Sequence, residues 1–262
     1  MDWNQLGDMI LLAIVQGIAE FLPISSSGHI VVLGTWLGVK ELDDVNVILH
    51  MGTLGAILVI YWTKLWQLIG EDRETIPRLI VATIPAVAIG LPLEKFGDEI
   101  LASPLLAGFM FIITGAILIY ISRRPVGKLE YQQLSYRHSL LIGFSQAFAV
   151  LPGISRSGTT ISAGLQVGLS RESAATFSFL MAVPVIAGAG LLKAIKLIGR
   201  EQAIATPMPI LGIGLVISFL VGLGSLLVLL RLLQRGRIAL FAYWCIPLGI
   251  LVITWRTYAS YQ

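Results

Sequence analysis

Six apolar stretches, each close to the length of a membrane-spanning helix, constrain this chain more than any other feature. A helix needs about 20 apolar residues to cross the hydrocarbon core of a bilayer. Residues 47–69, 76–93, 101–122, 172–195, 208–233 and 238–255 meet that requirement within a few residues. Charged residues make up only 13% of the chain, against about 25% in an ordinary soluble domain. The sequence therefore predicts an all-α polytopic membrane protein with six transmembrane helices.

Two further apolar segments are interrupted in the middle. Residues 6–39 are broken at Pro23, residues 140–169 are broken at Pro152, and each half is too short to cross a bilayer alone. We expect two re-entrant helical hairpins, because irregular backbone is tolerated at membrane depth only where protein or a wet cavity surrounds it. A signal peptide is set aside for the first segment, because Asp2 is acidic where a basic residue is expected and no small-residue cleavage site follows.

An internal repeat relates the two interrupted segments. A shift of 130 positions places the following residues on one another: Gln16 on Gln146, Ser25 on Ser155, Ser27 on Ser157, Gly28 on Gly158 and Gly34 on Gly164. Residues 1–262 are thus expected to form a single integral membrane domain of two repeats, about 1–122 and 136–256. Each repeat holds one hairpin and three spans, so the second starts on the opposite face. This is an inverted-topology repeat, and both hairpin tips should meet near the midplane.

The distribution of Lys and Arg predicts the orientation. The face with the termini carries 6 of them, and the other face carries 11. Because the richer face is usually cytoplasmic, both termini and the entrance of the first hairpin should lie outside. No block of like charge exists that could follow a nucleic-acid backbone, so nucleic acid is excluded as a partner. The single cysteine, Cys245, excludes an intramolecular disulfide and a cysteine metal site.

The tip of the first hairpin combines an acid, serines and a histidine. Gln16 and Glu20 are four residues apart and share one helix face, and an ionisable group in a membrane segment indicates function. The run Ser25, Ser26, Ser27 and Gly28 is typical of a helix N-terminus that binds an anion. His29 is favoured as a general acid or base. The alternatives are that Glu20 is an interfacial carboxylate, that the serines only cap a helix and that His29 is structural. The other two histidines, His50 and His138, are read as structural or interfacial.

The tip of the second hairpin contains Arg156. A guanidinium keeps its proton and presents a rigid fork of donors that suits phosphate oxygens. The flanking residues would add further donors at a second helix start: Ser155, Ser157, Gly158, Thr159 and Thr160. The alternative is a salt bridge from Arg156 to Glu20, which would then be the resting state. Together the two tips predict a phosphate site inside the bilayer.

Residues 16–29 and 151–160 closely resemble the two motifs of the bacterial undecaprenyl-diphosphate phosphatase family, also known as the bacitracin resistance protein family. The resemblance covers the whole chain. It implies hydrolysis of undecaprenyl diphosphate to the monophosphate and inorganic phosphate, on the outer side of the bacterial cytoplasmic membrane. This reaction recycles the lipid carrier of cell-wall synthesis. The partners would be a polyprenyl diphosphate and membrane lipids, and the oligomeric state, a dimer included, is left open.

The resemblance also implies a divalent cation, Mg²⁺ or Ca²⁺, with Glu20 and Gln16 as its candidate ligands. Many family members have Glu where this chain has Gln16, and Thr where it has Ser27. The amide at Gln16 weakens the expectation that two carboxylates share a metal.

The working hypothesis assigns the diphosphate to Arg156 and the two helix N-termini. Ser26 is the first choice of nucleophile and Ser27 the second, with His29 as base or acid and Glu20 orienting it or holding the metal. Direct attack by water is equally open. The runner-up function is an inverted-repeat transporter or flippase for a lipid phosphate or small anion, because such carriers share this plan. A purely structural membrane partner is the third alternative.

Overall fold

The structure is a computed structural model that describes residues 3–38, 42–198 and 206–259. Within these ranges every regular element is a helix, and the isolated β-bridge between Leu129 and Leu169 belongs to no strand. Five helices are long and apolar enough to cross a membrane, and a bent helix pair is a sixth candidate. The predicted all-α polytopic membrane fold is confirmed.

The first hairpin consists of α1 (Trp3–Ala19) and α2 (Ser26–Leu37). Pro23 lies in the turn between them, where its missing N–H costs no helical hydrogen bond. Ser25 caps α2, because its Oγ accepts a hydrogen bond from the Gly28 N–H at 3.3 Å. The serine run therefore begins a helix.

The second hairpin repeats this construction with α8 (Tyr136–Phe148) and α9 (Arg156–Gln166). Gly153 occupies the turn with a φ of 94°, a left-handed conformation that favours glycine. Ser155 caps α9 by accepting a hydrogen bond from the Gly158 N–H at 3.1 Å. Arg156 is thus the first residue of a helix, as Ser26 is in the other hairpin.

The longer remaining helices fill the predicted spans, with one difference, and short helical elements join them. They are α3 (Leu42–Ile60), α4 (Trp62–Ile69), α5 (Thr75–Phe96), α6 (Asp98–Leu101), α7 (Pro104–Ser122), η1 (Tyr131–Gln133), α10 (Arg171–Ile198), α11 (Met208–Gln234), η2 (Ile238–Phe241) and α12 (Ala242–Ala259). The predicted span 47–69 is not one continuous helix, because the chain bends by 72° between α3 and α4. In α4, Trp62 and Trp66 are exposed while Leu68 is buried, an amphipathic pattern that favours the membrane interface over a crossing.

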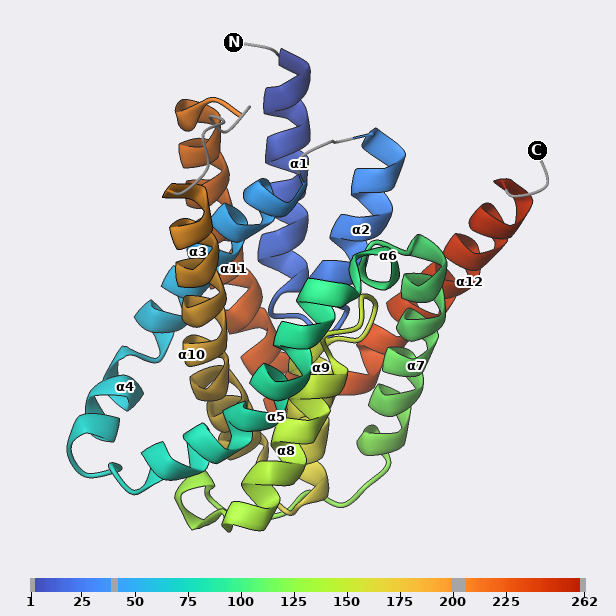
Figure 1. Cartoon of the computed structure of the whole chain (residues 1–262). Coiled ribbons are helices and arrows are strands. Elements are labelled where there is room, and N and C mark those ends of the chain that lie inside the picture. The colour runs from blue at the N-terminus through green and yellow to red at the C-terminus, as the bar shows by residue number, and fades with distance from the viewer. Residues whose placement is uncertain (1–2, 39–41, 199–205, 260–262) are drawn as a thin grey trace.

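The two hairpins enter the bundle from opposite ends (Figure 1). The start of α1 and the end of α12 lie towards one end, and α1 runs from there to a tip halfway through the molecule. The α8–α9 hairpin starts at the other end, and its tip reaches the same level. This arrangement is the one expected of two inverted repeats.

The two tips are in direct backbone contact. A Cβ added to Gly28 would lie 2.7 Å from the Cα of Gly153, so only glycine allows the tips to approach this closely. Ser25 Oγ accepts a hydrogen bond from the Gly153 N–H at 3.1 Å. From α7, Thr114 Oγ1 donates to the Gly153 carbonyl at 2.8 Å and accepts from the Ser155 N–H at 3.1 Å. These bonds hold both helix starts in a fixed relation.

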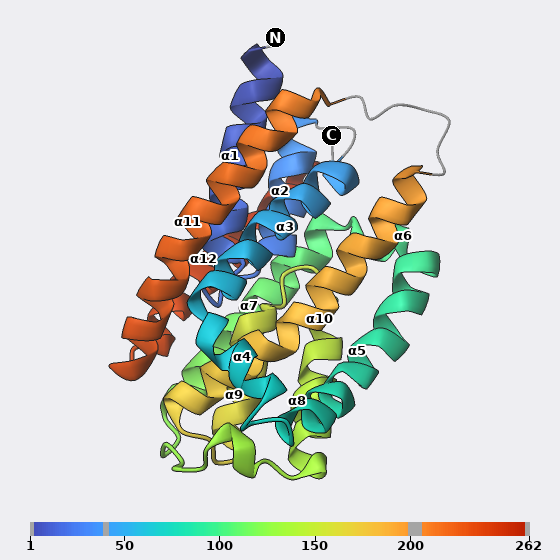
Figure 2. The ribbon, with the colours of Figure 1, turned by 90° about the vertical axis from the view of Figure 1, so that its left-hand side faces the viewer.

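Helix α11 packs along α1 and α3 (Figure 2). Gly17 and Gly52 face it closely, because added Cβ atoms would lie 2.8 Å from Val221 Cβ and 2.1 Å from Ser218 Oγ. Small residues at such crossings let membrane helices pack backbone to backbone. The packing fixes the polar end of α1 beside the first half of α3.

Candidate functional site

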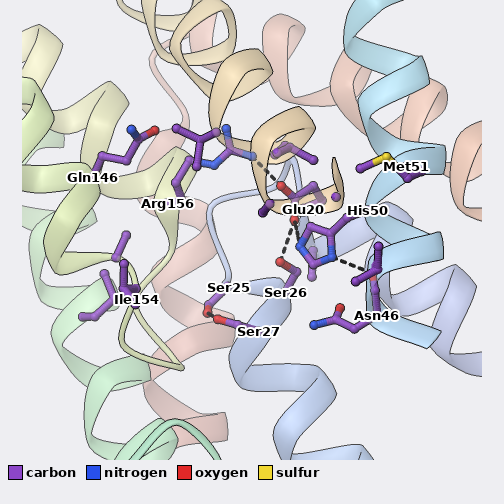
Figure 3. A pocket seen from close by; sticks show the side chains of 18 residues that line it. Glu20, Ser25, Ser26, Ser27, Asn46, His50, Met51, Gln146, Ile154 and Arg156 are labelled. Carbon is purple, nitrogen blue, oxygen red and sulfur yellow. Dashed lines mark hydrogen bonds and ion pairs between the residues drawn. The ribbon is translucent and has the colours of Figure 1, made fainter. Parts of the chain in front are cut away.

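A cavity of about 320 Å³ lies where the two hairpin tips meet α3 and α10. Its polar wall, shown in Figure 3, consists of Glu20, Ser25, Ser26, Ser27, Asn46, His50, Gln146 and Arg156. Its apolar wall includes Val47, Met51, Val150, Ile154, Val185 and Ile186. The lining residues of α3 and α10 come from the halves of those helices nearer the chain termini. A polar chamber with an apolar flank suits a ligand with a charged head and an apolar tail.

Glu20 is the centre of the hydrogen-bond network in this cavity, and it is only 6% exposed. Its Oε1 accepts a hydrogen bond from Arg156 Nη2 in an ion pair. Its Oε2 accepts hydrogen bonds from Ser26 Oγ at 2.7 Å and Gln16 Nε2 at 3.0 Å. The same oxygen lies 3.4 Å from His50 Nε2. A carboxylate buried this deeply requires such partners, because burying an unpaired charge is very costly.

The three serines of the first tip have different tasks. Ser26 Oγ alone among them contacts the carboxylate of Glu20. Ser25 Oγ accepts from the N–H groups of Gly28 and Gly153, so it holds the turn together. Ser27 Oγ lies 3.3 Å from Ser25 Oγ. The geometry thus singles out Ser26 as the hydroxyl beside a base.

The backbone at this turn is also strained. Among the described residues Ser25 is the only non-glycine residue with a positive φ, at 70°. Such a conformation costs free energy that the surrounding structure must offset, and it is typical of functional sites. Here it turns the chain so that Ser26 faces Glu20.

Arg156 divides its two terminal nitrogens between two environments. Nη2 pairs with Glu20, whereas Nη1 is buried and has no hydrogen-bond partner within the described chain. The guanidinium lines the cavity and its side chain is 17% exposed. It can therefore keep its ion pair with one nitrogen and receive an anion with the other.

The hydroxyls that flank Arg156 do not line the cavity. They close the first turn of α9 instead, because such side chains readily bond to nearby backbone carbonyls. Thr159 Oγ1 donates to the Ser155 carbonyl at 2.8 Å, and Thr160 Oγ1 donates to the Arg156 carbonyl at 2.7 Å. The following predicted phosphate donors therefore lie outside the cavity wall: Gly28, Ser155, Ser157, Gly158, Thr159 and Thr160.

His29 does not lie at the serine hydroxyls, in contrast to the expectation from its spacing. Its Nδ1 is 2.7 Å from the Ser25 carbonyl oxygen, and its Nε2 accepts a hydrogen bond from Trp244 Nε1 at 3.0 Å. Its ring packs edge-on against Phe111, with 5.0 Å between ring centroids. Both ring nitrogens are engaged and the residue is not part of the cavity wall. The structure gives His29 a supporting place between α2, α7 and α12.

His50, which is read from the sequence as structural or interfacial, lies in the site at the place that the spacing suggests for His29. It comes from α3 and its Nε2 faces Glu20 in the cavity. Its Nδ1 lies 2.8 Å from the Asn46 carbonyl oxygen, which can only accept, so Nδ1 carries a proton. The signal was present in the sequence, since His50 is an ionisable residue inside an apolar stretch. His138 lies in the first turn of α8, away from the cavity.

The residues around Glu20 do not fit a metal ion. Both carboxylate oxygens already accept hydrogen bonds, and one of them is paired with the positive charge of Arg156. Gln16 turns its Nε2 donor, not its oxygen, towards Glu20, and it does not line the cavity. Among the described residues, no group of three or more His, Cys, Asp or Glu side chains could hold an ion. The expectation that Glu20 and Gln16 hold a cation lacks the necessary donor set.

Comparison with known proteins places the chain in a family. A sequence profile described as bacitracin resistance protein BacA matches residues 9–251. An undecaprenyl-diphosphatase of Rhodopirellula baltica is 48% identical over 251 residues, which cover 95% of this chain and 98% of that protein. Undecaprenyl-diphosphatases of Methanosphaera stadtmanae and Halothermothrix orenii are each 38% identical, over 93% and 94% of this chain and 95% and 96% of theirs. The chain therefore belongs to the bacitracin resistance protein BacA family.

Proposed function

We propose that this protein hydrolyses undecaprenyl diphosphate to undecaprenyl phosphate and inorganic phosphate, and so recycles the lipid carrier of cell-wall synthesis. Relatives named for this activity match the chain over nearly its full length. The structural observation that carries the proposal is the 2.7 Å contact of Ser26 Oγ with Glu20 Oε2, in a cavity that also contains Arg156. A hydroxyl, a base and a fixed cation are the groups that phosphoryl transfer needs.

In the first step Ser26 Oγ attacks the terminal phosphorus of the diphosphate. The hydroxyl proton passes to Glu20 Oε2, the oxygen that already accepts its hydrogen bond. The bond from that phosphorus to the bridging oxygen breaks, and the lipid monophosphate leaves with the bond electrons. Arg156 stabilises the charge that develops on the leaving lipid phosphate as this bond breaks. Water then cleaves the phosphoserine, which releases inorganic phosphate and restores the hydroxyl.

His50 is the group that we assign to proton transfer at the leaving oxygen. Its Nε2 faces the cavity 3.4 Å from Glu20, so a proton taken up by the carboxylate can be passed on locally. His29 is assigned a positioning role, because its contacts to the Ser25 carbonyl and Trp244 fix the start of α2. In direct attack by water, the alternative to a phosphoserine, Glu20 would activate the water and Ser26 would only orient it.

The divalent cation implied by the family resemblance, Mg²⁺ or Ca²⁺, also belongs to this proposal. Since the donors around Glu20 are taken by Arg156, Ser26 and Gln16, we propose that such a cation enters bound to the oxygens of the diphosphate. It is then part of the substrate rather than a resident of the protein.

The cavity is proposed to open to the outer side of the bacterial cytoplasmic membrane. It lies on the side of the hairpin tips that faces the termini, while the opposite end of the bundle carries the larger number of Lys and Arg residues. Single cysteines placed at Asn46 and Lys128 test this orientation. An impermeant maleimide added to intact cells should label the cysteine at position 46, in the cavity wall, and spare the one at position 128, in the 123–130 loop. The reverse pattern would invert the topology.

Phosphate release by the purified protein tests the function directly. Wild type in detergent should liberate inorganic phosphate from a prenyl diphosphate, and Ser26→Ala should not. Ser122→Ala, at the exposed end of α7, serves as a matched control that retains activity. A protein that moves the lipid phosphate across vesicles without cleaving it would be a flippase, and the proposal would fail.

A further inference from the structure

Gln146 is the most unusual polar side chain of the cavity. It is 3% exposed and lines the cavity, yet neither its Nε2 nor its Oε1 has a hydrogen-bond partner within the described chain. Exchanging the two amide atoms would not help, because both are unpaired. Buried amides are nearly always satisfied, and an unpaired one costs free energy. An amide kept in this state is available to a ligand.

The internal repeat explains why Gln146 lacks a partner. Its equivalent in the first repeat, Gln16, donates from Nε2 to Glu20 at 3.0 Å. The position equivalent to Glu20 is Val150, which offers no acceptor. The second repeat therefore has the amide without the acceptor that Gln16 uses. The described part of the chain provides no partner for Gln146, which leaves its amide to a ligand in the cavity.

A second unpaired donor belongs to the same hairpin. Arg156 Nη1 is buried without a partner while Nη2 holds Glu20. Figure 3 shows Gln146 and Arg156 on the α8–α9 side of Glu20, and Ser26 and His50 on its other side. The cavity thus has two polar ends: one provides the attacking hydroxyl, and the other provides free donors.

We propose that Gln146 Nε2 and Arg156 Nη1 form a subsite for the second phosphate of the diphosphate, the one that stays on the lipid. The inference rests on the proposed function and adds a residue that binds the lipid-side phosphate. A diphosphate places its terminal phosphoryl group at Ser26 and its other phosphate at Gln146. The lipid monophosphate product keeps the phosphate that lies at Gln146. Gln146 accordingly holds the phosphate that the substrate and the lipid product share, and it positions the terminal phosphoryl group at Ser26.

The substitution Gln146→Leu tests the subsite, since leucine retains the bulk and removes both polar atoms. The KM for a prenyl diphosphate should rise by about tenfold, the effect of one lost hydrogen bond to a charged group. Inhibition by a prenyl monophosphate, which carries the same lipid-side phosphate, should weaken by a similar factor. Because the unpaired amide destabilises the empty cavity, the Tm of the ligand-free variant should equal or exceed that of wild type. Gln166→Leu, at the exposed end of α9, is the matched control and should change none of these values.

Three results would overturn the inference: an unchanged KM, unchanged inhibition by the prenyl monophosphate, or a fall in Tm that indicates a structural role. Gln146→Met, which keeps the length of the side chain, replaces the leucine variant if that variant does not fold. Failure of the proposed function is detected separately. If wild type releases no phosphate, the subsite can still be tested by binding. Methylene diphosphonate and inorganic phosphate are then compared as competitors of lipid binding, and wild type should prefer the diphosphonate. Gln146→Leu must abolish this preference.

Discussion

Replacement of Arg156 by lysine separates a phosphate-binding role from a purely structural ion pair. In the structure the guanidinium does two things at once: Nη2 pairs with Glu20, and Nη1 faces the cavity unpaired. Lysine has a single nitrogen on a flexible stem. The lysine nitrogen can pair with Glu20 or reach the phosphate. It cannot do both, because in arginine these two contacts are made by two different nitrogens.

The size of the effect follows from the contact that is lost. One donor removed from a water-poor site costs about 2 to 4 kcal/mol of transition-state stabilisation, which corresponds to roughly 30-fold to 1,000-fold in rate. Stability should change little in Arg156→Lys, because the charge beside the buried carboxylate of Glu20 is retained. We therefore expect a folded variant with a Tm close to that of wild type and a strongly reduced kcat/KM.

The assay is phosphate release from a prenyl diphosphate by purified protein, with a thermal melt of the same sample. Arg124→Lys is the matched control, because Arg124 is exposed and bonds only to Tyr120 in the structure. A variant at position 156 with activity within about threefold of wild type would refute the reasoning. In that case Arg156 would be a counter-ion for Glu20 and nothing more.

Three further predictions concern the remaining groups of the site. Ser26→Ala should lose at least about 100-fold in turnover, and Ser27→Ala less than about tenfold. A phosphoserine trapped on Ser26 should be detectable by mass spectrometry. If both variants stay active, water is the nucleophile. His50→Ala should lower kcat by about 100-fold at unchanged Tm, whereas His29→Ala should lower Tm together with activity. If instead His29→Ala lowers kcat at unchanged Tm and His50→Ala lowers Tm, proton transfer belongs to His29. Chelation of divalent cations should lower the rate, and Gln16→Leu should leave the half-saturating Mg²⁺ concentration within about twofold of wild type; a larger shift would restore Gln16 as a metal ligand.

The fold was largely predictable because the membrane imposes few solutions on an apolar chain. Continuous runs of about 20 residues can only be helices there, and five of the six predicted spans coincide with helices that pass the criterion of length and hydropathy. The break at Tyr61 was not predictable in this way. Residues 47–69 are apolar enough to cross as one helix, and only the faces of α4 reveal the bend, with Trp62 exposed and Leu68 buried.

Two ionisable groups of the site, Glu20 and Arg156, were predicted from the sequence, whereas its histidine and its geometry were not. Spacing identified Glu20 and Arg156 as an unusual pair inside apolar segments, but it could not decide which neighbouring hydroxyls face the cavity. A hydroxyl at a helix start can bind a ligand or close the helix turn, and the second tip uses Thr159 and Thr160 for the turn. His50 is distant from both motifs in sequence, and tertiary packing of α3 brings it to Glu20.

The repeat shows how a symmetric scaffold produces an asymmetric site. The same capped turn begins α2 and α9, and a shift of 130 positions places Ser26 on Arg156, the first residue of each helix. Two identical hairpins meeting at their tips would present two serines or two arginines, which could hold an anion but could not both attack and stabilise it. Divergence at this single position gives one helix start the hydroxyl and the other the cation. The buried carboxylate of Glu20 joins them, because it accepts a hydrogen bond from Ser26 and pairs with Arg156. Exchange of the two residues, Ser26→Arg with Arg156→Ser, would retain both groups yet move the hydroxyl to the subsite of Gln146, so the exchanged protein should bind diphosphate and fail to cleave it.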